Sequence, residues 1–145
     1  MLFGPVSISN AYRPASRALM VSFLERSSSC PELAGLVKAR SPFRGRWLKN
    51  LVEPADALAD DLDELSALVG ELEEGGKGVP VLLRQYLKMG GRLLAFNVDA
   101  RFSNALDGLI AVDLLRTDPR VLERYMGKEG LSRFLAWHSA PPRPQ

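Results

Sequence analysis

The chain has 145 residues, which is the usual size of one domain and is long enough to bury a core. Apolar residues make up 46% and charged residues 25%, close to the averages of soluble proteins, so the composition excludes a disordered or fibrous chain. The net charge of +2 is too small to indicate nucleic-acid binding by itself.

The first residues predict a strand followed by a helix. Residues 2–9 alternate apolar side chains, including Val6 and Ile8, with serines, which is typical of a β-strand. Pro5 cannot donate a ladder hydrogen bond, so it indicates an edge, a bulge or a strand start. A short turn and a helix over 14–26 follow, because a proline suits the first helical position.

The middle of the chain carries two segments of opposite charge. A brief strand is predicted at 35–41, and a basic cluster with interleaved aromatic side chains begins within it and continues to residue 49: Lys38, Arg40, Arg44, Arg46 and Lys49. They predict either a contact surface for phosphates, acidic lipid head groups or an acidic carrier protein, or a solvated loop that pairs with the acidic helix after it. That helix is predicted from Leu58 to Leu72, because leucines and a valine recur at helical spacing and carboxylates fill the other face.

Residues 79–89 predict another helix, stopped by two glycines. Its expected inward-facing side chains are Leu82, Leu83, Tyr86 and Leu87. Two segments that are apolar on both faces follow at 93–98 and 108–115, and they predict an antiparallel pair of strands that is central in a sheet or covered by helices. A last helix is expected to start at Thr117 or Asp118.

The start of the helix at 14–26 is a candidate anion site. Free amides and the helix dipole attract anions there, and Arg13 and Arg17 would reinforce a bound phosphate or pyrophosphate. The sequence has no P-loop and no Gly-x-Gly-x-x-Gly motif, so the alternative of a turn that binds nothing stays open.

Polar residues at the ends of the two late strands form a second candidate group. Asp113 lies in an apolar segment and needs a partner, which Arg92 or Arg116 could supply, or it caps a neighbouring helix. Asn97 and Asp99 are either functional or hold a loop through their own backbone.

The single Cys30 cannot form an internal disulfide and belongs to no metal cluster, so the chain is expected in the cytoplasm or at the inner membrane surface. No apolar segment approaches the ~20 residues of a membrane-spanning helix. A catalytic pair of Cys30 with His138 is conceivable, but a histidine beside Trp137 near the end of the chain is more often ordinary surface.

The order of these motifs is similar to that of a known family. From residue 2 to about 137 the chain resembles the C-terminal half of hemolysin-like and ornithine-lipid-synthase-like acyltransferases, which belong to the GNAT-like superfamily. The likeness is strongest from Gly78 to Gly127, where the motifs run in the order "PVLLRQYLKMGG", "FNVD", "LDGLIAVDL" and "DPR".

The resemblance implies an α+β, GNAT-like mixed sheet flanked by helices, with 1–137 as one domain and 138–145 as a frayed proline-rich tail. The first strand would lie beside the acyl thioester, and the strand at 35–41 would splay away to leave the thioester cleft. Implied donor-binding residues are Ser7, Ser9, Asn10, Arg13 and Arg17, and implied acceptor-side residues are Asn97 and Asp99. The catalytic base is not implied.

In that family an acyl group passes from an acyl carrier protein or acyl-coenzyme A to an amine or hydroxyl acceptor in lipid metabolism. The resemblance implies direct attack on the thioester, with backbone amides of the first strand stabilising the oxyanion. It implies no metal and no nucleic acid, and it is compatible with a homodimer and with peripheral membrane contact at most.

The chain departs from the family in two ways. A full member would have strands and two helices before "LFGPVSIS", and the usual phosphate loop of the superfamily is missing at 9–17. We therefore expect the C-terminal portion of a longer polypeptide. The alternative function is a non-catalytic half-domain that binds a partner or pairs with itself through an uncovered sheet edge.

Overall fold

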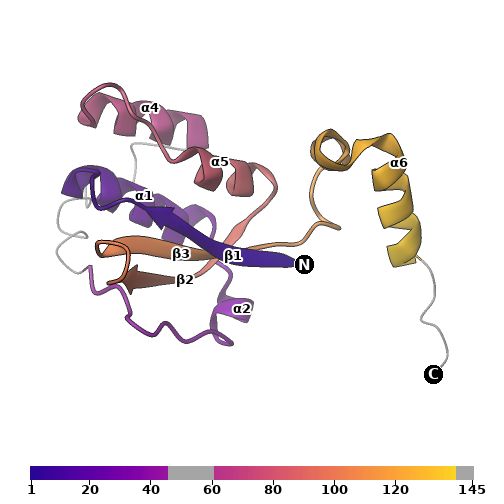
Figure 1. Cartoon of the computed structure of the whole chain (residues 1–145), viewed down its shortest axis with the longest axis horizontal. Helices are drawn as coiled ribbons and strands as arrows, with labels where there is room; N and C mark the ends of the chain where they lie inside the picture. The colour runs from indigo at the N-terminus through magenta and orange to yellow at the C-terminus, as the bar shows by residue number, and fades with distance from the viewer. Residues whose placement is uncertain (46–60, 140–145) are drawn as a thin grey trace.

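The protein is an α+β fold, as predicted, in which three strands form one antiparallel sheet and the helices pack mainly on one side of it (Figure 1). The computed structural model describes residues 1–45 and 61–139. The strands are β1 (Leu2–Ile8), β2 (Arg92–Asp99) and β3 (Ala105–Val112), and the helices are α1 (Pro14–Ser27), α2 (Pro31–Ala34), α4 (Leu62–Leu72), α5 (Val81–Lys88) and α6 (Pro119–Ser139).

The strand order is β1-β3-β2, so the amino-terminal strand and the two late strands share one sheet. β3 is central, which explains why its sequence is apolar on both faces. The predicted antiparallel pairing of β2 with β3 is confirmed, and Ser103 and Asn104 close the hairpin with positive φ angles of 50° and 56°. Every strand pair among the described residues is antiparallel, and parallel pairing is limited to one isolated bridge between Ser29 and Leu93.

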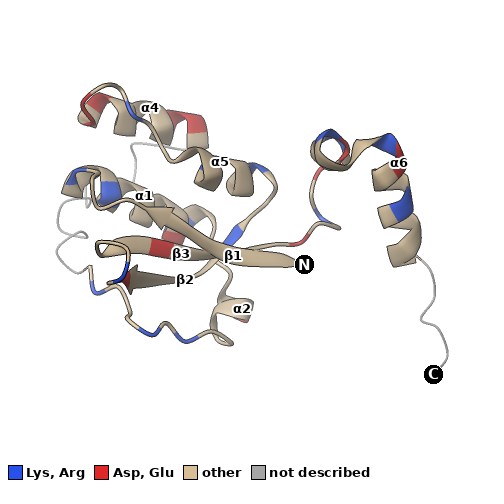
Figure 2. Cartoon of the chain, viewed as in Figure 1, with Lys and Arg blue, Asp and Glu red and all other residues tan. Residues whose placement is uncertain are grey.

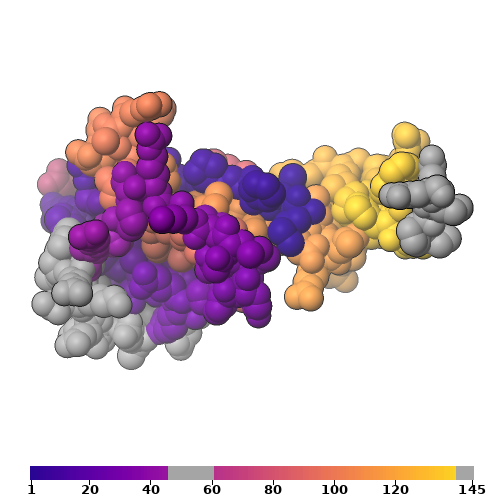
Figure 3. Space-filling model, turned by 90° about the horizontal axis from the view of Figure 1, so that it is seen from below, coloured from indigo at the N-terminus to yellow at the C-terminus, as the bar shows by residue number. Residues whose placement is uncertain are grey.

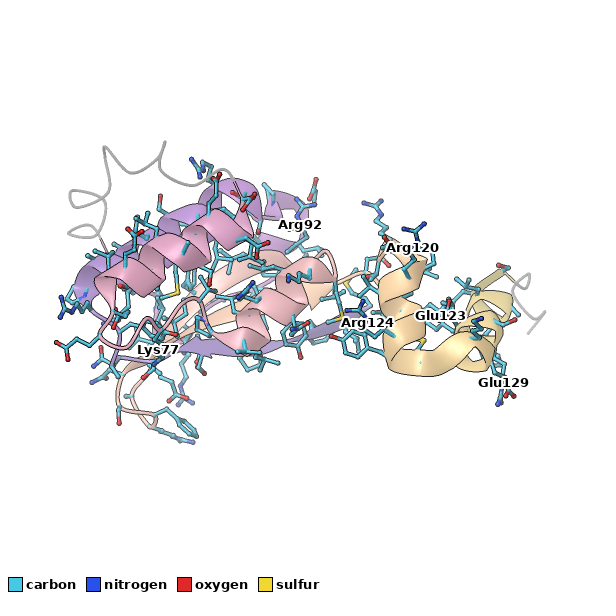
Figure 4. All side chains as sticks on the ribbon, turned by 90° about the horizontal axis from the view of Figure 1, so that it is seen from above. Lys77, Arg92, Arg120, Glu123, Arg124 and Glu129 are labelled. Carbon is cyan, nitrogen blue, oxygen red and sulfur yellow. The ribbon has the colours of Figure 1, made fainter. Side chains whose placement is uncertain are left out.

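Alternation along the strands separates the two faces of the sheet. Val6 and Ile8 of β1 are buried beside Leu106 and Ile110 of β3, and this face meets α1, α4 and α5. Figures 1 and 4 show these three helices on the same side of the sheet. The intervening side chains, including Ser7, therefore lie on the opposite face.

Residues 28–45 lie below β2 in Figure 1 and meet its outer edge, where Ser29 bridges to Leu93 and Pro42 bridges to Asn97. The strand predicted at 35–41 is wrong. The chain forms α2 and then turns, with Leu36 N donating to Leu33 O and Val37 N donating to Ala34 O. These local hydrogen bonds use backbone groups that a strand would have offered to a neighbour.

The outer edge of β2 is bonded by two short pieces of this segment. Leu93 donates its N–H to Ser28 O and accepts from Cys30 N, and Val98 N donates to Ser41 O. Both Leu93 and Val98 therefore direct backbone groups away from β3. In an antiparallel ladder, the backbone N–H and C=O groups of two opposite residues point either both toward each other or both away. Because those of Leu93 and Val98 point away from β3, those of their opposite residues Ile110 and Leu106 point toward β1.

This register determines which backbone groups of β1 are free. Gly4, Val6 and Ile8 face β3, so the groups of Phe3, Pro5 and Ser7 point outward. Among residues 1–45 and 61–139, no strand pairs with that outer edge. Pro5 thus lies in an edge strand, where its missing N–H costs no ladder bond, which confirms one of the predicted alternatives.

Three of the predicted helices agree with the structure in type, and one detail is wrong. α1 begins at Pro14, as predicted. α5 lies within the predicted 79–89 but begins two residues later, at Val81. α6 begins at Pro119, with Asp118 accepting from Arg120 N. Leu82 is predicted to face inward but is 57% exposed, because the buried face of α5 is narrower than predicted and is centred on Leu83. The predicted helix start at Leu58 lies outside the described residues, which show α4 from Leu62.

α6 extends away from the rest of the molecule (Figures 1 and 3). It is bent at Gly127, whose φ of 71° and ψ of 168° are not helical. His138 belongs to this helix and packs edge-on against Phe134, far along the chain from Cys30. No helix among the described residues is long and apolar enough to cross a membrane.

Candidate functional site at the start of α1

The predicted site residues lie at one end of the sheet, where β1 and β2 end and β3 begins. Ser7 is directly opposite Asp107, and Asp107 is directly opposite Asn97, so the three form one polar row across the sheet. The Ser7 hydroxyl donates to Asp107 Oδ1 at 2.6 Å. Asp107 therefore lies between one predicted donor-side residue and one predicted acceptor-side residue, and it accepts a hydrogen bond from the first.

Asn97 and Asp99 also hold loops: Asp99 does so within its own turn, as the structural alternative predicts, whereas Asn97 holds a segment distant in the chain. The Asn97 side-chain oxygen accepts from Ser41 N at 2.8 Å and so fastens the segment beside β2. The Asp99 carboxylate accepts from Arg101 N at 2.9 Å within the hairpin turn. An acceptor-binding role for these two residues stays a prediction.

The other four predicted donor-side residues gather at the first turn of α1. The Arg17 guanidinium donates to Asn10 Oδ1 at 2.6 Å, and the Ser9 hydroxyl accepts from Ala11 N at 3.1 Å. Arg13 is the residue before the first helical turn. The turn that follows β1 thus places two guanidinium groups beside helix amides that have no acceptor within the helix.

An anionic group already lies at this position, and it comes from the chain itself. The Glu73 carboxylate accepts from Arg13 N at 2.8 Å, and Glu74 forms an ion pair with the Arg13 guanidinium at 3.0 Å. Both acids follow the last turn of α4, whose ends carry acidic residues in Figure 2. We call Glu73 and Glu74 the carboxylate pair.

The Glu73 carboxyl titrates below its ordinary range. The nearby Ser16 hydroxyl lowers the pKa of Glu73 most. Burial, the second-largest effect, opposes this, and the Arg13 amide and the charges of Arg13 and Lys77 lower the pKa further. Ser16 is fully buried, and in the structure its hydroxyl makes no hydrogen bond at ordinary distance. The Arg17 Nε is likewise buried without a partner.

The turn between α4 and α5 explains why two acids reach α1. Gly75 and Gly76 adopt φ angles of 79° and 71°, which side chains disfavour, and reverse the chain directly after the carboxylate pair. The turn is fastened further on, because Tyr12 Oη donates to Gly78 O at 2.8 Å and Ser66 Oγ accepts from Val79 N at 3.1 Å.

Lys77 completes the positive surroundings of the site. Its ammonium lies over the Tyr12 ring, 4.0 Å from the centroid, and it is labelled at the α4–α5 turn in Figure 4. Burial, and then the charge of Glu73, raise the pKa of Tyr12, so this phenol stays protonated and donates. Arg13 and Lys77 thus lie close enough to Glu73 to lower its pKa, and Arg17 lies in the same first turn of α1.

The predicted thioester cleft between the first strand and residues 35–41 is wrong. β3 and β2 lie between them, because β1 pairs on one side of β3 while Pro42 bridges to Asn97 on the outer edge of β2. A thioester beside β1 would have to lie along its free outer edge instead.

A cavity of about 500 Å³ lies at the other end of the sheet, away from the predicted residues. Its polar lining is Cys30, Glu32, Arg92, Asp113 and Arg116. These groups pair with one another or with backbone: the Cys30 thiol donates to Glu32 at 3.2 Å, Arg92 donates to Ser29 O, and Arg116 lies 3.6 Å from Asp113. The predicted pairing of Asp113 with Arg116 is confirmed.

The charge of Glu32 follows from these neighbours. The hydrogen bond from Cys30 lowers the pKa of Glu32 most, with smaller contributions from Arg92 and Arg116. The cavity is therefore lined by balanced charges, and the start of α1 is the stronger candidate for binding an anion.

Searches of protein-family models, curated proteins and solved structures gave no significant match to this chain.

Glu73 and Glu74 were missed as site residues because they were read only as the end of an acidic, solvated helix. The signal available in the sequence was their position, "EEGGKG", in which two acids stand directly before two glycines that reverse the chain. Which other helix that turn would meet depends on tertiary packing, which the local sequence does not encode.

Proposed function

We propose that the chain is the C-terminal portion of a GNAT-like acyltransferase, which moves an acyl group from an acyl carrier protein or acyl-coenzyme A to an amine or hydroxyl of a lipid-related acceptor. The proposal starts from the sequence resemblance. The observation that supports it best is the outward-pointing amide of Ser7, which lies on the free edge of β1, shortly before the cationic start of α1.

This arrangement suits a thioester donor. Phosphate groups of the donor would meet Arg13, Arg17 and the first amides of α1, while the acyl chain extends along the edge of β1. The Ser7 N–H would then donate to the thioester carbonyl oxygen. Pro5 offers no donor at the preceding outward position, so the Ser7 amide is the one free donor of β1 beyond it.

The chemical step needs no covalent enzyme intermediate. The acceptor nitrogen or oxygen forms a bond to the carbonyl carbon, the oxyanion is stabilised by the Ser7 amide, and the carbon–sulfur bond then breaks. The thiolate leaves with the electron pair, and the proton lost by the acceptor goes to the thiolate or to solvent.

The test is thiol release from acyl-coenzyme A and from acyl carrier protein, with amine and hydroxyl acceptors, by the folded chain. Ser7→Pro removes the proposed donor, and Ser7→Ala is the matched control that removes only the hydroxyl. We expect Ser7→Pro to lower turnover by about 10²–10³-fold and Ser7→Ala to change it by only a few fold. Absence of thiol release with every donor, or equal turnover in the two variants, would contradict the proposal.

A second candidate is the non-catalytic module, and the unpaired outer edge of β1 favours it. The edge has no charged side chain between Met1 and Asn10, and Phe3 is 73% exposed on it. If the edge pairs with a second copy, Phe3→Lys should convert an associated form to a monomer in sedimentation experiments. A monomeric wild-type chain across the accessible concentration range excludes pairing of this edge with a second copy.

A further inference from the structure

We infer that the carboxylate pair is a built-in competitor for the anion site: Glu73 and Glu74 occupy the start of α1, and a pyrophosphate-bearing ligand binds only when they turn away. This inference rests on the proposed function for the identity of the ligand as a phosphate-bearing donor. The competition itself is argued from contacts within the chain.

The first observation is that the site attracts an anion in the structure. Arg13 donates from its backbone N–H to Glu73 and from its guanidinium to Glu74, so one residue holds both acids. Each of these hydrogen bonds is charge-assisted, which makes it shorter and stronger than a neutral one. The groups that hold Glu73 and Glu74 are the same groups that a phosphate would use.

The second observation is that the carboxylate pair does not satisfy the whole site. The buried Ser16 hydroxyl and the buried Arg17 Nε have no hydrogen-bond partner in the structure. Both belong to the first turn of α1, and buried polar groups in folded proteins are nearly always paired. Ser16 lies close to Glu73 but forms no hydrogen bond of ordinary length with it. A pyrophosphate has more acceptor oxygens than a carboxylate, so it can complete the bond to Ser16 and also reach the Arg17 Nε.

The third observation is that exchange requires little movement. The backbone of the turn is fastened by Tyr12 to Gly78 and by Ser66 to Val79, so it can stay in place. Glu74 is strongly exposed, with 92% of its side chain accessible, and its release needs only rotation into water. Displacing the pair leaves three cations, Arg13, Arg17 and Lys77, around the incoming phosphates.

The apparent affinity for a ligand equals the intrinsic affinity multiplied by the fraction of molecules in which the site is open. Removing the competitor should therefore tighten binding. Glu73→Gln keeps the shape of the side chain and removes its charge, and Glu71→Gln is the matched control. Glu71 is an exposed acid on α4, and its replacement changes the net charge of the chain by the same amount.

The experiment is a titration of the full chain with inorganic pyrophosphate, followed by ¹H–¹⁵N NMR at Arg13, Ser16 and Arg17. We expect Glu73→Gln to bind about tenfold more tightly than wild type, with shifts centred on these residues. Glu71→Gln should stay within about twofold of wild type, because its charge acts only at a distance. An equal gain in both variants, or no gain in Glu73→Gln, would overturn the inference.

Glu74→Gln keeps the test decisive if Glu73→Gln does not fold, because the contact of Glu74 within residues 1–45 and 61–139 is an exposed ion pair with Arg13, whose loss should affect folding little. Its expected gain is about threefold, and no gain would count against the inference. Coenzyme A and inorganic phosphate, titrated in parallel, separate a donor cofactor from a simple ion: tighter binding of coenzyme A supports a donor site, and equal affinity for phosphate contradicts it.

The two proposals fail separately. Tighter pyrophosphate binding by Glu73→Gln without thiol release from any thioester leaves the competition standing and removes acyl transfer. Thiol release by the wild-type chain, with pyrophosphate affinity unchanged in Glu73→Gln, supports acyl transfer and removes the competition.

Discussion

Proline substitution at two neighbouring positions of β1 tests the strand register on which the free Ser7 amide depends. Gly4 directs its N–H to Ile110 on β3, whereas Phe3 directs its own to the outer edge. A side chain added at Gly4 meets no heavy atom within 4 Å, so steric conflict contributes little there. The two prolines therefore differ mainly in whether a ladder hydrogen bond is lost.

The expected loss of folding free energy in Gly4→Pro comes from the Ile110 carbonyl, which loses its hydrogen-bond donor. Ile110 is 1% exposed, and an unsatisfied polar group in such a position costs about 1–3 kcal/mol. We expect Gly4→Pro to lower the free energy of unfolding by about 2 kcal/mol relative to Gly4→Ala. Phe3→Pro should lie within about 0.5 kcal/mol of Phe3→Ala, because no ladder bond is lost.

Urea unfolding followed by circular dichroism measures these differences, and unchanged slopes would show that the unfolded state is not affected. The alanine variants are the controls for side-chain loss. Equal costs for the two prolines, or a larger cost for Phe3→Pro, would refute the assigned register and with it the outward direction of the Ser7 amide.

Three further predictions follow from the core, the α4–α5 turn and the anion site. Leu106→Ala should cost about 2–5 kcal/mol in urea unfolding, because Leu106 is fully buried in the central strand, whereas Leu36→Ala, at an 81% exposed position, should cost less than about 0.5 kcal/mol. A similar loss in both would mean that β3 is not in the core. Gly78→Ala should lose about 1–3 kcal/mol, because its Cβ would lie 2.3 Å from Ser66 Oγ and 2.9 Å from Ser66 O, while Gly35→Ala meets open space and should be neutral in thermal unfolding. The lowered pKa of Glu73 means that its contribution to stability is present above its ordinary pKa and is lost as the pH falls through the folded-state value. The difference in urea midpoint between wild type and Glu73→Gln should therefore be larger at about pH 7 than at about pH 3, and a difference independent of pH would contradict the assignment.

Hydrophobic periodicity was sufficient to predict the strands and most helices. The serine alternation around Val6, the two-sided apolar segment that became β3, and the proline before α1 each express a local preference that tertiary packing also satisfies. The strands, the helices and the antiparallel pair of late strands could therefore be predicted, whereas only the family resemblance implied that the first strand shares their sheet.

The errors arise where neighbours in space decide the outcome. "LVKAR" is predicted as a strand, but the N–H groups of Leu36 and Val37 bond to carbonyls of the last two residues of α2. The outer edge of β2 is bridged instead by Ser29 and Pro42, which lie on either side of "LVKAR". Leu82 belongs to an apolar pair in sequence, but only Leu83 meets the core. Glu73 looks like solvated surface until α4 packs beside α1 and places it on Arg13.

Amide hydrogen exchange along β1, measured residue by residue by NMR, tests most directly whether Ser7 offers a free donor at the sheet edge. The register predicts slow exchange at Gly4, Val6 and Ile8, which bond to β3, and fast exchange at Phe3 and Ser7. Protection of the Ser7 amide equal to that of Val6 would show that the edge is already paired, and it would contradict the proposed role of Ser7 in acyl transfer.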